Sequence, residues 1–417
     1  VEMVELYAGG RDSVYLFKRY TDIRLVASPE LQLAYFGGDW DNFTYPRYDL
    51  DMTFYRIYDE NGDPFQTENY FPFDETGVSE GDLVFVIGNP GSTSRLQTVA
   101  ELEYRRDVSD KAVVNFLQTR VLALQEYAES HPEEAREMDL RNAVFGFLNQ
   151  LKAYTGIVAG LNDPVKVAKR RDHERNFQAA IEADPALRAE YGQLIPRMAE
   201  IQAQKKEHAA ALSSVLAIGH PQLGSATLGR ALSAFQYLSA QSQGAPQGTL
   251  DEIRGALVST PEQPREINEG QLAQRFHDFV REFGDDSPFV EQILQGRTPE
   301  GLAAVIMAQS PLADSASTEA ALAAGDLTMD DPAIRLIPLI GQVLGPAQQV
   351  QMATSQEEAE ISSALGRALF AVYGTDVPPD ATFSLRIADG VVENYEYNGT
   401  VAPINTTFYG LYDHYHS

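Results

Sequence analysis

The segment "FGGDWDNFTYPRYDLDMTFYRIY", residues 36–58, contains four aspartates and eight aromatic residues. Its last part, "LDMTFYRIY", is rich in aromatic and apolar residues and predicts a β-strand with Asp51 at its head. The part before this strand is a polar loop that contains three aspartates together with Asn42 and Arg47. A plain surface loop rarely has so many aromatic rings, so the chemistry of this loop needs an explanation of its own.

The residues of the loop leave three hypotheses open. In the first, the loop is a solvated acidic turn in which Arg47 offsets a carboxylate. In the second, Asp39, Asp41 and Asn42 bind Ca²⁺ as hard oxygen donors, although the spacing lacks the Gly and Glu of an EF-hand loop. In the third, Asp51 is the carboxylate that orients the histidine of a Ser–His–Asp triad.

The composition is that of a globular protein. Hydrophobic residues make up 44% of the 417 positions, and this length predicts more than one domain. The formal net charge of −28 makes nucleic acid an unfavourable partner, and the absence of cysteine excludes disulfides, thiolate metal sites and a cysteine nucleophile. No uninterrupted apolar stretch is long enough to predict a membrane span.

Three regions of the chain differ in their sequence patterns. Residues 1–100 contain short β-like runs separated by turn signals such as "ENGDP", which is typical of a small barrel or sandwich. Residues 101–373 have the 3.6-residue periodicity of helices, several of which begin at Asp-Pro. Residues 374–417 return to a β-like pattern. The order predicts a multi-domain α+β protein in which a helical cap interrupts one β scaffold.

The chain begins at Val1 and ends in "NTTFYGLYDHYHS". Strand-like sequence starts within a few residues of Val1, and neither a helix nor a polar tail closes the chain. We therefore expect this sequence to be an internal fragment of a longer protein.

The quoted segment and the later "GNPGSTSR", residues 88–95, resemble the bacterial dipeptidyl-peptidase 7 and dipeptidyl-peptidase 11 family. These proteins are serine exopeptidases. The family pattern is Gly-Gly-Asp-x-Asn-aromatic-x-x-Pro-Arg before the strand of the triad aspartate, then Gly-x-Pro-Gly-x-Thr-x-Arg. Weaker similarity in "DIRLVASPE", "FLNQLKAYTGIVAGL" and "FSLRIADGVVENYE" extends the resemblance over nearly the whole chain. It implies a chymotrypsin-like double β-barrel, incomplete at both ends here, with a helical insertion.

The resemblance assigns roles to five residues. Asp51 corresponds to the triad aspartate, and Asn42 corresponds to the family Asn that holds the free α-amino group of the substrate. Phe43 stands where the family usually has Trp, and Arg47 matches the Arg that braces this subsite. Asn149 is the best match for an Asn of the helical domain that reaches the peptide N-terminus, with an interhelical polar contact as the alternative.

The resemblance places the triad histidine upstream of this chain and the triad serine downstream of it, so we expect the chain to be inactive alone. Ser92 and Ser94 lie in a motif that suits a tight loop rather than a nucleophile elbow. His173, His208 and His220, in the helical region, are expected to be surface or capping side chains. A catalytic role for His414 or His416 would break the His–Asp–Ser order of the family.

The predicted function is that of a serine-type dipeptidyl aminopeptidase, which releases dipeptides from the free N-terminus of peptides without a cofactor or a metal. The family also implies a periplasmic or extracellular location and a homodimer in the intact protein. Two alternatives stay open: a non-catalytic peptide-binding homologue and an endopeptidase of the same fold. The side-chain preference at the penultimate substrate position cannot be derived from these residues.

Overall fold

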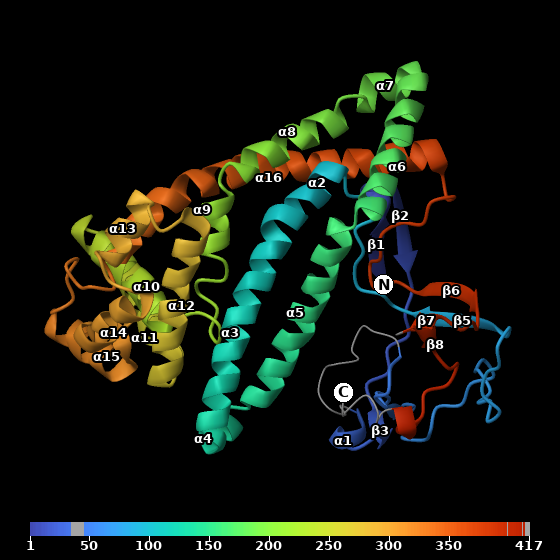
Figure 1. Cartoon of the computed structure of the whole chain (residues 1–417), viewed down its shortest axis with the longest axis horizontal. Helices are drawn as coiled ribbons and strands as arrows, with labels where there is room; N and C mark the ends of the chain where they lie inside the picture. Colours follow the sequence, from blue (N-terminus) through green and yellow to red (C-terminus); the bar gives the residue numbers. More distant parts are fainter. Residues whose placement is uncertain (35–45, 398, 411, 413–417) are drawn as a thin grey trace. The chain divides into compact units, whose positions relative to one another are not determined.

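The computed structural model describes residues 1–34, 46–397, 399–410 and 412. The chain forms two units, each held by its own internal contacts. The first unit comprises residues 1–97, 183–191 and 362–417, and the second comprises residues 98–182 and 192–361. Strands occur before and after a long helical region, so the β–α–β order along the chain is confirmed (Figure 1).

The strands of the described residues belong to the first unit and pair two by two. Each pair is antiparallel: β1 with β2, β3 with β4, β5 with β6, and β7 with β8. The strands are β1 (Glu2–Leu6), β2 (Arg11–Tyr15), β3 (Ile23–Ala27), β4 (Phe54–Ile57), β5 (Leu83–Gly88), β6 (Arg386–Val391), β7 (Glu396–Tyr397) and β8 (Thr400–Val401). The double β-barrel is not confirmed, since these strands form no closed barrel within the described residues.

The β5–β6 sheet joins the two β-rich ends of the chain. Beside it, Asn89 donates a hydrogen bond to the carbonyl of Phe383 at 2.9 Å. The carboxylate of Asp380 accepts from Thr93 Oγ1 at 2.5 Å and from the backbone N–H of Arg95 at 2.7 Å. The "GNPGSTSR" segment is therefore a structural connection that fastens residues after β5 to those before β6.

Helices make up the second unit, whereas α1, α7 and the C-terminal turns of α16 belong to the first. The helices are α1 (Leu31–Ala34), α2 (Val99–Tyr104), α3 (Asp110–Ser130), α4 (Pro132–Glu137), α5 (Leu140–Asn162), α6 (Pro164–Ala183), α7 (Pro185–Tyr191), α8 (Leu194–Lys206), α9 (Ala209–Ser214), α10 (Ala226–Ser242), α11 (Gln247–Val258), α12 (Arg265–Phe283), α13 (Pro288–Leu294), α14 (Pro299–Gln309), α15 (Ser315–Ala324) and α16 (Leu336–Tyr373). A π-helical turn, η2 (Arg105–Ser109), joins α2 to α3.

The predicted Asp-Pro helix starts are confirmed at α6 and α7. Asp163 Oδ1 accepts hydrogen bonds from the backbone N–H groups of Val165 and Lys166, at 2.8 and 3.3 Å. Asp184 does the same at the start of α7. Proline suits the first helical position because it has no N–H to leave unpaired, while the aspartate accepts from the next free N–H groups. Each Asp-Pro dipeptide thus encodes a helix boundary.

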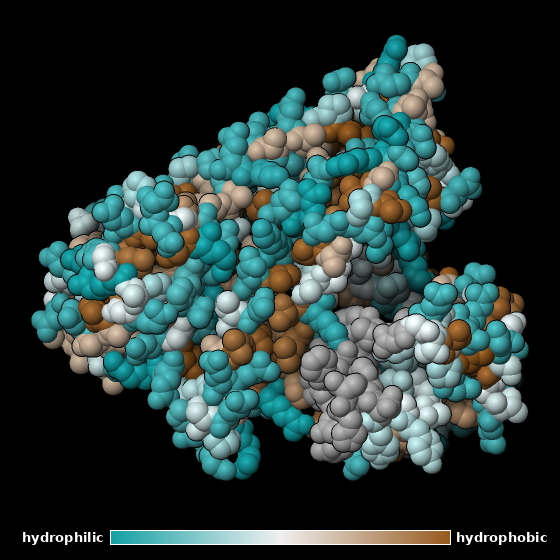
Figure 2. Space-filling view, viewed as in Figure 1, coloured by the Kyte–Doolittle hydropathy of each residue, from teal (hydrophilic) through white to brown (hydrophobic). Residues whose placement is uncertain are grey.

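Two hydrophobic clusters form the core of the second unit. The larger cluster gathers side chains from α10 to α16, including Phe276 and Phe279 of α12. The smaller one lies mainly between α3, α4 and α5, and it also contains Ile267 from the start of α12. Helix α12 therefore contributes to both clusters. On the face shown in Figure 2, mainly hydrophilic side chains cover these helices.

A buried cluster of charges lies between α12 and α3. The carboxylate of Asp278 accepts from Arg120 at 2.5 and 3.2 Å and lies 3.3 Å from Arg275 and 2.8 Å from Arg281. The side chains of Arg120, Arg275 and Asp278 are at most 3% exposed. Arg275 also donates to the carbonyl of Leu216 at 2.7 Å. One carboxylate therefore compensates three guanidinium groups, two of them out of contact with water.

We expect Asp278→Asn to lower the free energy of unfolding by about 3–5 kcal/mol, because it leaves two buried guanidinium groups without a counter-charge. The measurement is urea unfolding followed by circular dichroism. Glu133→Gln is the matched control, since it removes an exposed ion pair with Arg136 and should cost less than about 1 kcal/mol. Equal losses in the two variants would contradict the role given to Asp278.

His220 stabilises a turn in the second unit while its ring is neutral. Its Nδ1 accepts from the backbone N–H groups of Gln222 and Leu223 at 3.2 and 3.1 Å, and its ring meets the edge of Phe147. Partial burial lowers the pKa of His220 below its ordinary value. A protonated Nδ1 could not accept either hydrogen bond, so the folded turn favours the neutral ring.

Stability should therefore fall as the pH is lowered through the ordinary histidine range. The unfolded chain gains a proton at His220 near pH 6.5, while the folded chain resists protonation, so acid favours unfolding. His220→Asn offers a side-chain oxygen to the same N–H groups without titrating, and should reduce the loss of melting temperature between pH 7 and pH 5. An unchanged pH dependence in this variant would contradict the assignment.

Candidate functional site

Asp51 lies in an irregular connection that leads into β4, in a tight turn where the N–H of Met52 donates to the carbonyl of Leu50 at 3.1 Å. The predicted strand begins later than expected, because β4 starts at Phe54 and residues 50–53 pair with no strand of the described part of the chain. Its partner β3 ends at Ala27, opposite Phe54, after a register shift that follows Leu25. No described strand continues alongside residues 50–53, so Asp51 lies on a connection rather than in a sheet.

Arg47 bridges two of the carboxylates of the loop. Its Nη2 atom donates to Asp51 Oδ2 at 3.0 Å and lies 3.9 Å from Asp49 Oδ2. The Asp49 side chain is 3% exposed, whereas that of Asp51 is 69% exposed. No local pattern indicates the burial of Asp49, because the fold decides which of two neighbouring aspartates faces inward. The arrangement holds one oxygen of Asp51 and leaves its side chain accessible.

The neighbours of this connection belong to the same unit. The N–H of Leu50 donates to the carbonyl of Leu33 at 2.9 Å, which ties the connection to the end of α1. The ring of Tyr48 lies so close to Gly410 that a Cβ there would come within 2.9 Å of it. Residues near both ends of the chain therefore contribute to the surroundings of Arg47 and Asp51.

The other predicted site residues are placed differently. Asn42 and Phe43 lie outside the described residues. Asn149 lies on α5 in the second unit, and its side chain is exposed. The structure therefore brings together Arg47 and Asp51, while the roles of Asn42, Phe43 and Asn149 stay predictions.

The five histidines of the described residues, His131, His173, His208, His220 and His277, belong to the second unit. The described part of the first unit thus offers no histidine to Asp51. His414 and His416 lie outside the described residues.

A Ser–His–Glu sequence of contacts at the end of α3 resembles a triad but is structural. Ser130 Oγ lies 3.0 Å from His131 Nδ1, and His131 Nε2 lies 3.5 Å from Glu266 Oε2. Ser130 Oγ also lies 2.9 Å from the carbonyl of Glu126 and 3.1 Å from that of Tyr127, as donor. The hydroxyl thus satisfies carbonyl groups in the last turn of the helix, which is common for serine.

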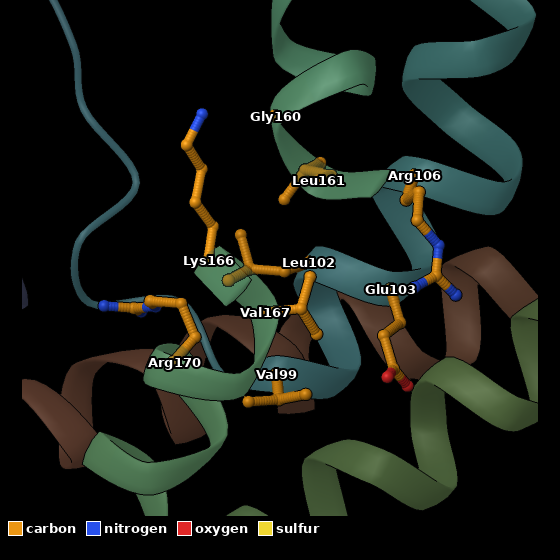
Figure 3. Close-up of a pocket in the computed structure, with 9 residues that line it drawn as sticks. All are labelled: Val99, Leu102, Glu103, Arg106, Gly160, Leu161, Lys166, Val167 and Arg170. Carbon is orange, nitrogen blue, oxygen red and sulfur yellow. The ribbon is translucent and has the colours of Figure 1, made fainter. Parts of the chain in front are cut away.

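A small pocket lies where α5 ends and α6 begins, against α2 (Figure 3). Its walls are mainly apolar, from Val99, Leu102, Leu161 and Val167, and the side chains of Lys166 and Arg170 lie at its edge. Its volume is about 40 Å³, which suits water rather than a peptide.

The described residues contain no group of three His, Cys, Asp or Glu side chains placed to hold a metal ion. The Ca²⁺ hypothesis concerned Asp39, Asp41 and Asn42, which lie outside these residues. Among the helices of the described part, none is long and apolar enough to cross a membrane.

The sequence model of the peptidase S46 family matches residues 1–417. The chain belongs to this family. It is 24% identical to dipeptidyl-peptidase 7 of Porphyromonas endodontalis over 99% of this chain and 51% of that protein. It is 28% identical to an Asp/Glu-specific dipeptidyl-peptidase of Capnocytophaga gingivalis over 45% of this chain and 28% of that protein.

Solved structures show the same fold. The crystal structure of Porphyromonas endodontalis DPP11 in complex with the dipeptide Arg-Asp matches 99% of this chain and 61% of that chain, with a TM-score of 0.72 and 18% identity. A second crystal structure of Porphyromonas endodontalis DPP11 gives a TM-score of 0.71 with 18% identity. This chain spans about half the length, or less, of the curated relatives named above.

Proposed function

We propose that this chain is the part of a serine dipeptidyl aminopeptidase that contains the triad aspartate, Asp51. The family match over residues 1–417 carries this proposal. The names of its relatives, dipeptidyl-peptidase 7 and Asp/Glu-specific dipeptidyl-peptidase, support cleavage two residues from a free N-terminus. The substrates are peptides, and the reaction needs neither a cofactor nor a nucleic acid.

The proposed reaction is acyl transfer to a serine. The serine Oγ attacks the carbonyl carbon of the second residue while a histidine takes its proton, and water later hydrolyses the acyl-enzyme. Both residues come from the length that the relatives have beyond this chain. Asp51 accepts a hydrogen bond from the other ring N–H of that histidine. This bond fixes the tautomer of the histidine and stabilises the imidazolium.

The ion pair with Arg47 supports this role for Asp51. Arg47 binds Oδ2, and no described residue bonds to Oδ1, so this oxygen can accept the histidine N–H. A triad carboxylate acts best when water is excluded, because its interaction with the imidazolium is stronger at low dielectric constant. The proposal therefore requires further residues of the enzyme to cover Asp51, whose side chain is exposed here.

Recognition of the peptide N-terminus is proposed for Asn42, Phe43 and Asn149, with Arg47 bracing the loop. The closed end of the substrate cleft pairs with the α-ammonium group of the peptide. This contact places the bond after the second residue at the catalytic serine. Leaving that cation buried without a partner would be costly, so only a correctly placed N-terminus allows cleavage.

We extend the proposal to the setting of the intact enzyme. It has a chymotrypsin-like double β-barrel, to which the two-stranded sheets of the first unit contribute. It forms a homodimer in the periplasm or outside the cell. The family resemblance supports each of these points, and the net charge of −28 is compatible with them.

In the intact enzyme, Asp51→Asn should lower kcat about 10⁴-fold, because an amide cannot hold the histidine in its productive tautomer. Steady-state hydrolysis of a chromogenic dipeptide substrate measures the effect. Asp12→Asn is the matched control, since Asp12 is an exposed aspartate of β2 in the same unit. Near wild-type turnover of the Asp51 variant, in a folded enzyme, would overturn the assignment.

Acetylation of the substrate N-terminus tests the exopeptidase class. We expect kcat/KM for an acetylated peptide to fall on the order of 100-fold or more, because the subsite loses its cation. Cleavage of both peptides at similar rates would identify an endopeptidase instead. Binding of the free peptide without cleavage would identify a non-catalytic homologue.

A further inference from the structure

A polar cavity of about 140 Å³ lies in the second unit, between η2, α3, α9 and α12. It has space for several water molecules, and thus for one small oxyanion. One of its walls is the π-helical turn Arg105–Ser109. Such turns are rare and frequently occur at functional sites. The cavity is formed wholly by residues of one unit.

Three hydrogen-bonding side chains line this cavity without a partner among the described residues. Lys111 and Asn115 lie one turn apart on the same face of α3, and Ser213 comes from the end of α9. Ser213 is 8% exposed, although its hydroxyl neither donates to nor accepts from a described residue. Lys111 is exposed and Asn115 is half-buried, so of the three only Ser213 is buried. A hydroxyl in a buried residue normally has a hydrogen-bond partner, so Ser213 indicates that a polar group occupies the cavity.

The two carboxylates in the lining are already neutralised. Asp107 accepts from Arg106 at 2.7 Å and from Lys206 at 2.6 Å, and these bonds lower its pKa to about 2. Glu282 accepts from Arg281 Nε at 2.9 Å. Neither carboxylate therefore needs a metal ion or an ammonium group from outside.

The charge behind the cavity is positive. Arg281, in the lining, also contacts Asp278, whose carboxylate is shared with the buried Arg120 and Arg275. The groups that line the cavity or belong to these ion pairs comprise six cations, Lys111, Arg106, Lys206, Arg281, Arg120 and Arg275, and three carboxylates, Asp107, Glu282 and Asp278. In a chain of net charge −28, this local excess favours an anion.

We propose that this cavity binds a small oxyanion, a phosphate or a carboxylate, through Lys111, Asn115, Ser213 and Arg281. The ammonium of Lys111 and the guanidinium of Arg281 supply charge-assisted hydrogen bonds. The amide of Asn115 and the hydroxyl of Ser213 donate to the remaining oxygen atoms. The bound anion compensates part of the positive charge around Asp278 and connects α3, α9 and α12. This site is independent of the proposed peptidase chemistry.

Isothermal titration calorimetry on the full chain, at constant ionic strength in chloride, tests the proposal with inorganic phosphate and with acetate. At least one of the two should bind at a stoichiometry of one. Tighter binding of phosphate would identify a phosphate site, and tighter binding of acetate would identify a carboxylate site. Lys111→Gln should weaken binding about tenfold or more, because it removes a charged hydrogen bond.

Two further variants make the test specific. Ser213→Ala should also weaken binding, although by less than Lys111→Gln, because a neutral donor is lost. Lys169→Gln, at an exposed lysine of α6 outside the cavity, should leave the affinity unchanged. The proposal is overturned if neither anion binds in the presence of chloride. It is also overturned if Lys111→Gln and Lys169→Gln weaken binding equally, since only the general charge would then matter.

Discussion

The packing of α3 against α12 in the second unit depends on a single buried carboxylate, Asp278, which pairs with two buried guanidinium groups and with the partly exposed Arg281. It connects α12 to α3 through Arg120, and to the residues after α9 through Arg275, which donates to the carbonyl of Leu216. Burial and the nearby Arg120 lower the pKa of Arg275 to about 9, so charge in this place is costly. Such a cluster is stable only while every member is paired, which restricts how α3 and α12 can pack.

The pair of Arg47 and Asp51 has the opposite character. Asp51 is largely exposed, and an ion pair in contact with water adds little to stability. The Arg47–Asp51 pair instead sets geometry, because it holds one carboxylate oxygen of Asp51 in place and leaves the other oxygen available. In the proposed enzyme, orientation of a histidine needs this property more than stability. The same pair of residue types thus serves packing in one unit and, in the proposed enzyme, the orientation of a histidine in the other.

The sequence predicted those features of the fold and site that depend on near neighbours. Asp163 and Asp184 mark helix starts because an aspartate accepts from N–H groups two or three residues later. Arg47 and Asp51 are four residues apart, so their pairing needs no distant part of the chain. The start of β4 was predicted too early, because a strand extends only as far as its partner, and the end of β3 at Ala27 is not visible in residues 50–58.

By itself, then, the sequence determined the β–α–β order, the family and the candidate aspartate, since periodicity, turn residues and motifs are local properties of the chain. Only the tertiary structure decided which distant groups meet: Asp380 with Thr93, Arg120 with Asp278, and Lys111 with Ser213 at one cavity. A lone arginine or serine in a helix has no pattern that distinguishes burial from exposure. The role of such a side chain depends on the residues of other helices that it contacts, and only folding brings those residues within hydrogen-bonding distance.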